Sequence, residues 1–149
     1  MHVYRISIAK YSNGLVASGN PARWCPKDVF MIYTASSRSL ACLENVVNRD
    51  QFGLMQPFNI LTINCPPSIK IKTVLLKSLS PDWKDRDQIH LTRSLGENWI
   101  RENQSAILCV PSSIIEEENN YLLNPNHPDF KLIKIVKTQP FVFDSRIKL

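Results

Sequence analysis

Apolar and polar residues alternate at the start of the chain, whereas further along the apolar residues recur every three or four positions. Val3 to Ala9 alternates and predicts a half-buried strand. Tyr11 to Ala22 is rich in glycine, asparagine and serine and predicts a long loop, a feature that small domains keep mainly for function. Val29 to Tyr33 is a short apolar run and predicts a second strand.

An N-cap serine and an apolar repeat at helical spacing follow the second strand. Ser36 or Ser37 can accept a hydrogen bond from the first turn of a helix. Leu40, Leu43 and Val47 then recur at three- and four-residue spacing, which predicts the buried stripe of an amphipathic helix. Loop, strand, tight turn and helix therefore form the unit around which the chain is organised.

Three polar residues in this unit can carry chemistry. Glu44 falls at the border of the predicted apolar stripe, where a carboxylate lies either at the rim of the core or in a cleft. Tyr33 ends the predicted strand, and Arg23 lies in the loop before it. Two interpretations stay open: a structural Arg–Glu ion pair beside an ordinary half-buried tyrosine, or a cation, a ring and a carboxylate that converge on one hollow.

The rest of the chain predicts more strands than helices. A helix is expected from Asp82 to Leu95, with Gly96 at its end or at a break before Asn98–Ile100, and a hydrogen-bond-rich loop from Asn119 to Pro128. Further strands are expected at Phe58–Ile63, residues 69–76, Ile107–Val110, Leu132–Val136 and Phe141–Phe143. Because no β-α-β rhythm is present, we predict an α+β fold: a single compact domain over residues 1–149, mainly antiparallel small sheets with a few helices.

Composition and charge narrow the class of protein. Hydrophobic residues make up 44% and charged residues 21% of the 149 residues, as in ordinary globular proteins. No apolar run approaches the ~20 residues of a membrane span, and the N-terminus does not resemble a signal peptide, so we expect a cytoplasmic protein with no membrane partner. The lysines behind the net charge of +5 are dispersed, so direct nucleic-acid binding is not expected.

The four cysteines do not predict a metal site. They are widely spaced, with no C-x-x-C pair, so we expect reduced thiols and no metal. Cys25 lies near Arg23, but a thiol nucleophile needs a partner base and none is adjacent in the sequence. We therefore interpret Cys25 as structural.

Several ordered motifs resemble the RES domain family. The motifs are Arg-Trp at 23–24, Ile-Tyr-Thr-Ala at 32–35, Ser-Leu-Ala-Cys-Leu-Glu at 39–44, Leu-Gly-Glu-Asn-Trp at 95–99, Val-Pro-Ser-Ser at 110–113, the loop 119–128 and Phe-Val-Phe-Asp-Ser-Arg at 141–146. The resemblance covers nearly the whole chain, and it implies a fold similar to ADP-ribosyltransferases.

The resemblance also implies a set of site residues. The arginine, tyrosine and glutamate of the family fall on Arg23, Tyr33 and Glu44, and its serine falls on Ser112, with Ser113 as the alternative. By this resemblance Glu44 and Arg23 are catalytic. Arg23, Tyr33 and Ser112 are the residues expected to bind NAD+.

Two positions in the loop after Arg23 depart from the family pattern. Asparagine is common where this chain has Cys25, and glycine is common where it has Asp28. These two differences affect how the loop would contact the nucleotide, and they leave the four family residues unchanged.

A function follows as an expectation from the resemblance. Members are toxins of bacterial RES–Xre type II toxin–antitoxin systems that cleave the nicotinamide–ribose bond of NAD+, by hydrolysis or phosphorolysis, and arrest growth by depleting NAD. The expected partner is a helix-turn-helix, Xre-like antitoxin that occludes the active site. Two alternatives stay open: an ADP-ribosyltransferase that modifies a cellular protein, and a non-catalytic module that binds the antitoxin or a nucleotide.

Overall fold

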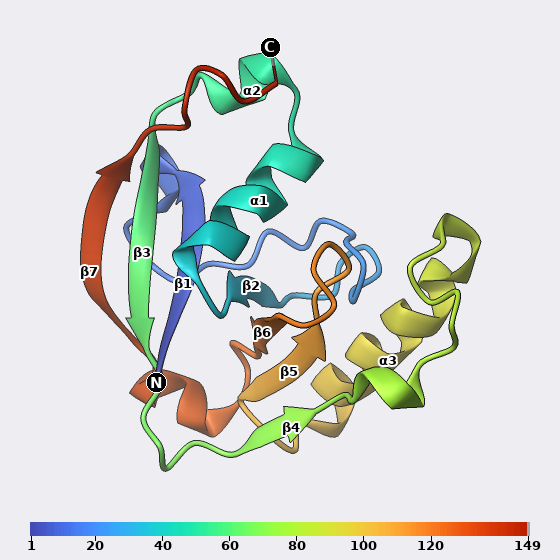
Figure 1. Cartoon of the computed structure of the whole chain (residues 1–149). Coiled ribbons are helices and arrows are strands. Elements are labelled where there is room, and N and C mark those ends of the chain that lie inside the picture. Colours follow the sequence, from blue (N-terminus) through green and yellow to red (C-terminus); the bar gives the residue numbers. More distant parts are fainter. Residues whose placement is uncertain (149) are drawn as a thin grey trace.

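A single continuous sheet of seven strands forms the centre of the molecule in the computed structural model, which describes residues 1–148 (Figure 1). The strands are β1 (His2–Ile8), β2 (Ile32–Ala35), β3 (Phe58–Asn64), β4 (Ile71–Thr73), β5 (Ile107–Pro111), β6 (Asn119–Leu123) and β7 (Lys134–Phe141). Their order is β4-β5-β6-β2-β1-β3-β7, and every neighbouring pair is antiparallel except β4 with β5. The predicted α+β class with mainly antiparallel pairing is confirmed.

Helices cover different parts of the sheet. They are α1 (Arg38–Asn48), α2 (Gln51–Leu54) and α3 (Ile89–Glu102), and Figure 1 shows α1 beside β1 and β2 while α3 lies toward β4 and β5. Leu40 of α1 belongs to a buried cluster with Ile6 and Phe58, whereas Trp99 of α3 packs with Leu108 and Leu122. No helix within residues 1–148 is long and apolar enough to cross a membrane.

Two predicted strands begin or end elsewhere in the structure. The strand expected from Val29 starts only at Ile32, because Asp28 has a left-handed backbone (φ 65°) and the Val29 N–H closes a turn on the Pro26 carbonyl. In the stretch 69–76 only β4 is a strand, and a 3₁₀ turn follows at Leu76–Ser78.

The predicted loop from Asn119 to Pro128 is wrong in its first half. Residues 119–123 form β6, which pairs with β2 on one side and β5 on the other. The asparagines at its start favour a loop by local propensity, but pairing on both sides decides the outcome. The last two predicted strands are replaced by one, β7, which pairs antiparallel with β3; Leu132 lies in a 3₁₀ turn before it, and Val142 and Phe143 lie beyond its end.

The helix predicted from Asp82 to Leu95 is misplaced. It begins at Ile89 and continues through Gly96 to Glu102, and it ends where Asn103 adopts a left-handed backbone (φ 50°). Gly96 is therefore inside the helix. A Cβ atom at Gly96 would come within 1.8 Å of the Trp24 carbonyl oxygen, so the glycine permits a backbone-to-backbone approach.

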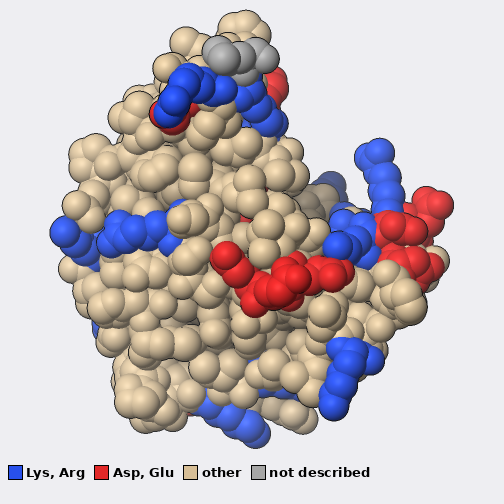
Figure 2. Space-filling view, in the orientation of Figure 1, with Lys and Arg blue, Asp and Glu red and all other residues tan. Residues whose placement is uncertain are grey.

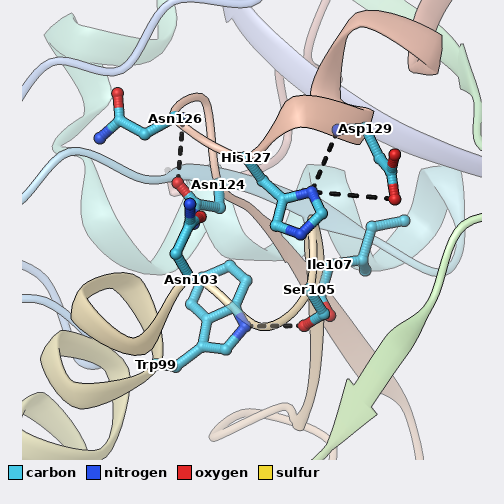
Figure 3. A network of polar contacts seen from close by, with 8 residues as sticks. All are labelled: Trp99, Asn103, Ser105, Ile107, Asn124, Asn126, His127 and Asp129. Carbon is cyan, nitrogen blue, oxygen red and sulfur yellow. Dashed lines mark hydrogen bonds and ion pairs between the residues drawn. The ribbon is translucent and has the colours of Figure 1, made fainter.

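A polar network ties the end of α3 to the sheet (Figure 3). The Trp99 indole N–H donates to the Ser105 hydroxyl at 2.9 Å, and the Asn124 amide donates to the Asn103 side-chain oxygen at 2.9 Å. His127 Nδ1 accepts from the Asp129 backbone N–H at 3.1 Å. His127 thus stabilises the turn that leads into residues 128–132.

Candidate functional site

A hollow of about 720 Å³ lies between α1, the middle of β1 and the loop around Arg23. Its lining includes Tyr33, Glu44 and Arg23, three of the four predicted site residues, together with Ser113. The volume is within the range of small-molecule sites in proteins. The structure therefore brings the cation, the ring and the carboxylate to one hollow.

Glu44 reaches the hollow because α1 is rotated relative to the predicted stripe. Leu40 and Ala41 are the buried residues of α1, whereas Val47 is 55% exposed and lines the hollow beside Glu44. Val47 was predicted as core, and that prediction is wrong. The N-cap is Ser37, whose hydroxyl accepts from the Leu40 N–H at 3.0 Å.

Burial makes the carboxyl group of Glu44 harder to ionise, and three neighbouring groups partly offset this effect. Burial raises the pKa of Glu44 above its ordinary value, and the Asn120 amide, the Ser112 hydroxyl and the charge of Arg23 pull it partly back. The Ser112 hydroxyl donates to Glu44 Oε1 at 3.4 Å. A partly desolvated carboxylate interacts more strongly with a positive charge than one in water does.

The two serines at the end of β5 have different positions. Ser112 is fully buried, and its oxygen also accepts from the N–H groups of Ile114 and Ile115 at 3.1 and 3.2 Å. Ser113 is half-exposed and lines the hollow. Ser112 therefore supports the carboxylate of Glu44 and the turn after β5, while Ser113 is the serine that faces the open space.

Backbone carbonyls hold the guanidinium of Arg23. Arg23 Nη1 donates to the Trp83 carbonyl at 3.1 Å and Nη2 to the Lys84 carbonyl at 2.9 Å, and the group lies 5.7 Å from the centre of the Trp83 ring. No direct ion pair joins Arg23 and Glu44 within residues 1–148. The interpretation as a simple structural ion pair is therefore not supported by the geometry.

Helix α3 fixes the backbone of the Arg23 loop. The Thr92 hydroxyl donates to the Arg23 carbonyl at 2.6 Å, and Arg93 Nε donates to the Ala22 carbonyl at 2.9 Å. These contacts and the approach at Gly96 place the loop against one face of α3. The loop lacks regular structure, yet its path is determined by three neighbouring positions of a helix.

Tyr33 joins the hollow to the same loop. Its hydroxyl accepts from the Trp24 N–H at 3.0 Å and donates to Cys25 Sγ at 3.5 Å, and burial raises the pKa of the phenol. Cys25 is itself buried, consistent with its structural interpretation. Asp28, where family members commonly have glycine, has the positive φ that glycine adopts most easily.

Four functional candidates escaped the sequence analysis. Arg5, Arg49 and Arg93 line the hollow with Arg23, and Asn120 lowers the pKa of Glu44. Burial and the neighbouring charge of Arg49 lower the pKa of Arg5, whose Nη1 donates to the Tyr33 carbonyl at 2.9 Å. A charged residue inside an otherwise half-buried strand was the available signal for Arg5.

The chain is similar to known proteins over nearly its whole length. The RES domain model matches residues 2–144. A Sphingobium protein named Prs ADP-ribosylating toxin is 34% identical over 91% of this chain and 85% of its own length, and a Yersinia enterocolitica protein named Toxin Res is 32% identical over 99% and 100%. The M. tuberculosis MbcT–MbcA toxin–antitoxin complex contains a similar fold, with a TM-score of 0.74 at 15% identity, covering 95% of this chain and 84% of that chain.

The chain belongs to the RES domain family. Its named relatives are called toxins, and the solved fold that it resembles is part of a toxin–antitoxin complex.

Proposed function

We propose that the protein cleaves the nicotinamide–ribose bond of NAD+ and arrests growth by depleting NAD. The observation that supports this most directly is one desolvated carboxylate, Glu44, in a hollow that four arginines also line. NAD+ carries a positive nicotinamide at one end of a ribose and a negative pyrophosphate at the other. A site with one anion and several cations is complementary to both ends.

One carboxylate is sufficient for this reaction. The pyridinium leaves as neutral nicotinamide, so no general acid has to protonate the leaving group, in contrast to ordinary glycoside hydrolysis. As the bond breaks, positive charge develops on the ribose ring. In the proposal Glu44 binds a ribose hydroxyl and stabilises this charge, and Ser112 and Asn120 hold the carboxylate in its ionised form.

The arginines and the tyrosine orient the substrate. A guanidinium donates two parallel hydrogen bonds to a phosphate, which suits Arg23 to the pyrophosphate, with Arg5, Arg49 and Arg93 as further cations in the same hollow. The Tyr33 ring stacks on the nicotinamide in this proposal. Its hydroxyl, bonded to the Trp24 N–H, keeps the ring and the loop in a fixed relation.

The acceptor of ADP-ribose distinguishes three versions of the proposal. Water gives hydrolysis and inorganic phosphate gives phosphorolysis, whereas a side chain of a cellular protein gives ADP-ribosylation. The third version is favoured by one specific observation, the 34% identical relative named as an ADP-ribosylating toxin. No metal is required in any version, because the leaving group is already activated by its charge.

A protein partner belongs to the proposal. We expect a helix-turn-helix, Xre-like antitoxin that covers the hollow and blocks access of NAD+. The similarity to a toxin found in a toxin–antitoxin complex supports such a partner.

The test is nicotinamide release from NAD+ by the purified protein, with and without inorganic phosphate, for the parent chain and Glu44→Gln. Glu44→Gln should lower release by about 100-fold or more. Because burial raises the pKa of Glu44, its ionisation opposes folding above its unfolded pKa, so the variant should keep or exceed the parent thermal midpoint at neutral pH. Glu97→Gln, an exposed site on α3, is the matched control.

Each outcome decides between versions. Release that requires phosphate identifies phosphorolysis, and release without phosphate identifies hydrolysis. If neither occurs but labelled NAD+ marks a protein in a cell extract, the acceptor is that protein. Near-parental release by Glu44→Gln would refute the proposed role of the carboxylate, and no reaction in any assay would leave the non-catalytic binding module as the better description.

A further inference from the structure

A second, smaller hollow lies outside the pocket of Glu44. It has a volume of about 210 Å³ and is lined by Leu76, Leu79, Ser80, Pro81, Trp83 and Glu116; we call it the Trp83 groove. The residues come from the segment between β4 and α3 and from the turn between β5 and β6. Of the residues that line it, Trp83 alone also supports the site of the proposed function, because its carbonyl accepts from Arg23.

The groove contains polar atoms without partners. Within residues 1–148 three buried side-chain polar atoms lack a hydrogen bond, and two of them, Trp83 Nε1 and Ser80 Oγ, belong to this groove. Trp83 is only 3% exposed. A buried donor without an acceptor is unfavourable by itself, so its presence beside a hollow points to an acceptor that binds there.

A half-exposed ion pair covers the groove at one side. Lys84 Nζ lies 2.8 Å from Glu116 Oε1, and this contact lowers the pKa of Glu116. Glu116 is near enough to the Trp83 indole for the indole to lower that pKa further, but the indole nitrogen has no acceptor at hydrogen-bond geometry. Since exposed ion pairs stabilise proteins little, a cation from another molecule can replace Lys84.

The surroundings combine apolar surface with negative charge. Leu75 and Leu76 are 51% and 40% exposed beside the groove. Residues 82–87 and 116–118 together contain six acidic and two basic side chains, in a chain whose net charge is +5. Figure 2 shows acidic atoms gathered near the centre of this face and again at its right edge. The region therefore has the opposite charge to the molecule as a whole.

We propose that the Trp83 groove docks a basic segment of a partner protein. One apolar side chain of the segment packs between Leu76, Leu79 and Pro81, and a backbone carbonyl accepts from Trp83 Nε1. Lysine or arginine side chains on either side of the apolar residue contact the carboxylates of residues 82–87 and 116–118. This surface is separate from the hollow that binds NAD+ in the proposed function.

The test uses the full ¹⁵N-labelled chain and a capped hexapeptide of alternating lysine and leucine. The indole N–H resonances of the three tryptophans report binding, with Trp83 assigned from Trp83→Phe. The Trp83 resonance should shift on titration, while that of Trp99, already bonded to Ser105, should not. Glu116→Lys should weaken binding by about fivefold or more. Glu102→Lys, which removes a comparable half-exposed pair with Lys72, should not.

Control peptides complete the test. Replacement of lysine by glutamate should abolish the Trp83 shift, and replacement of leucine by alanine should weaken it. The proposal is overturned if the Trp83 indole does not respond at millimolar peptide, if the acidic peptide binds equally well, or if Glu116→Lys and Glu102→Lys have the same effect.

Discussion

The two walls of the Glu44 pocket are built in different ways. The carboxylate wall consists of regular elements, since Glu44 is on α1 and Ser112 follows β5 directly. The arginine wall is the loop around Arg23, whose backbone and side chain are held by Trp83, Lys84 and Thr92, residues 60 to 69 positions away. A helix and the end of a strand therefore carry the groups of the first wall, whereas an irregular loop held by tertiary contacts carries the second. We expect mutations to affect the walls unequally.

Among changes that leave Glu44 and Arg23 themselves in place, the largest effect is expected from Gly96→Ala. The new methyl group would overlap the Trp24 carbonyl, so the loop or α3 must shift. We expect NAD+ cleavage to fall by about tenfold or more, since small displacements of binding groups are costly. The free energy of unfolding should decrease by about 1–3 kcal/mol.

Urea unfolding and steady-state kinetics measure these two effects. Gly14→Ala is the matched control, because its Cβ would have no neighbour closer than Val16 Cγ2 at 4.0 Å. Parental activity in Gly96→Ala would show that the arginine wall tolerates displacement.

A smaller effect on the same wall is expected from Thr92→Val. The substitution keeps the shape of a buried side chain but removes the hydrogen bond to the Arg23 carbonyl, which contributes about 1 kcal/mol. The KM for NAD+ should rise by about threefold to fivefold, with kcat changed less than about twofold. Ser94→Ala, which removes a hydroxyl–carbonyl bond within α3, should change neither value.

The pH profile tests the carboxylate wall. Glu44 must be ionised to act, so activity should fall as the pH drops through its raised pKa, which lies above the ordinary 4.5. Ser112→Ala removes a hydrogen bond to the ionised form and should move this acidic limb to higher pH, by less than about one pH unit. A limb that moves to lower pH, or does not move, would contradict the role given to Ser112.

The smallest effect on activity is expected from Ser37→Ala. Loss of this N-cap should lower the free energy of unfolding by about 1 kcal/mol. The rate of NAD+ cleavage should stay within about twofold of the parent, because Leu40 and Ala41 keep α1 docked on the sheet. Ser39→Ala, in the exposed first turn, is the control. A large loss of activity in Ser37→Ala would remove the contrast between the walls.

The same contrast explains what could be predicted from the sequence. The capping serine and the strand at Phe58–Ile63 follow from local pattern, and the structure confirms both. The burial of Val47 was predicted wrongly, because an apolar residue at the mouth of a pocket has the same spacing as one in the core. Gly96 was taken as a helix end because a glycine that permits close approach looks identical in sequence to one that ends a helix.

The arginines show the limit of pattern analysis more clearly. Arg23 was singled out by its place in the loop before a strand and received its role from the motifs of the RES family, whereas Arg5 and Arg93 were missed. No local signal connects residues 5, 23 and 93, because the order of the strands and the position of α3 in the fold bring them together.

The hydrogen bonds that hold Arg23 have a consequence for how the sequence of such proteins can evolve. Its guanidinium is bonded to the carbonyls of Trp83 and Lys84, and a carbonyl is present whatever side chain the residue carries. Residue 84 can therefore change its side chain without altering what Arg23 touches. A deletion or insertion between β4 and α3 would alter these contacts, because it would move both carbonyls. Selection on this segment should thus preserve its length more strictly than its composition.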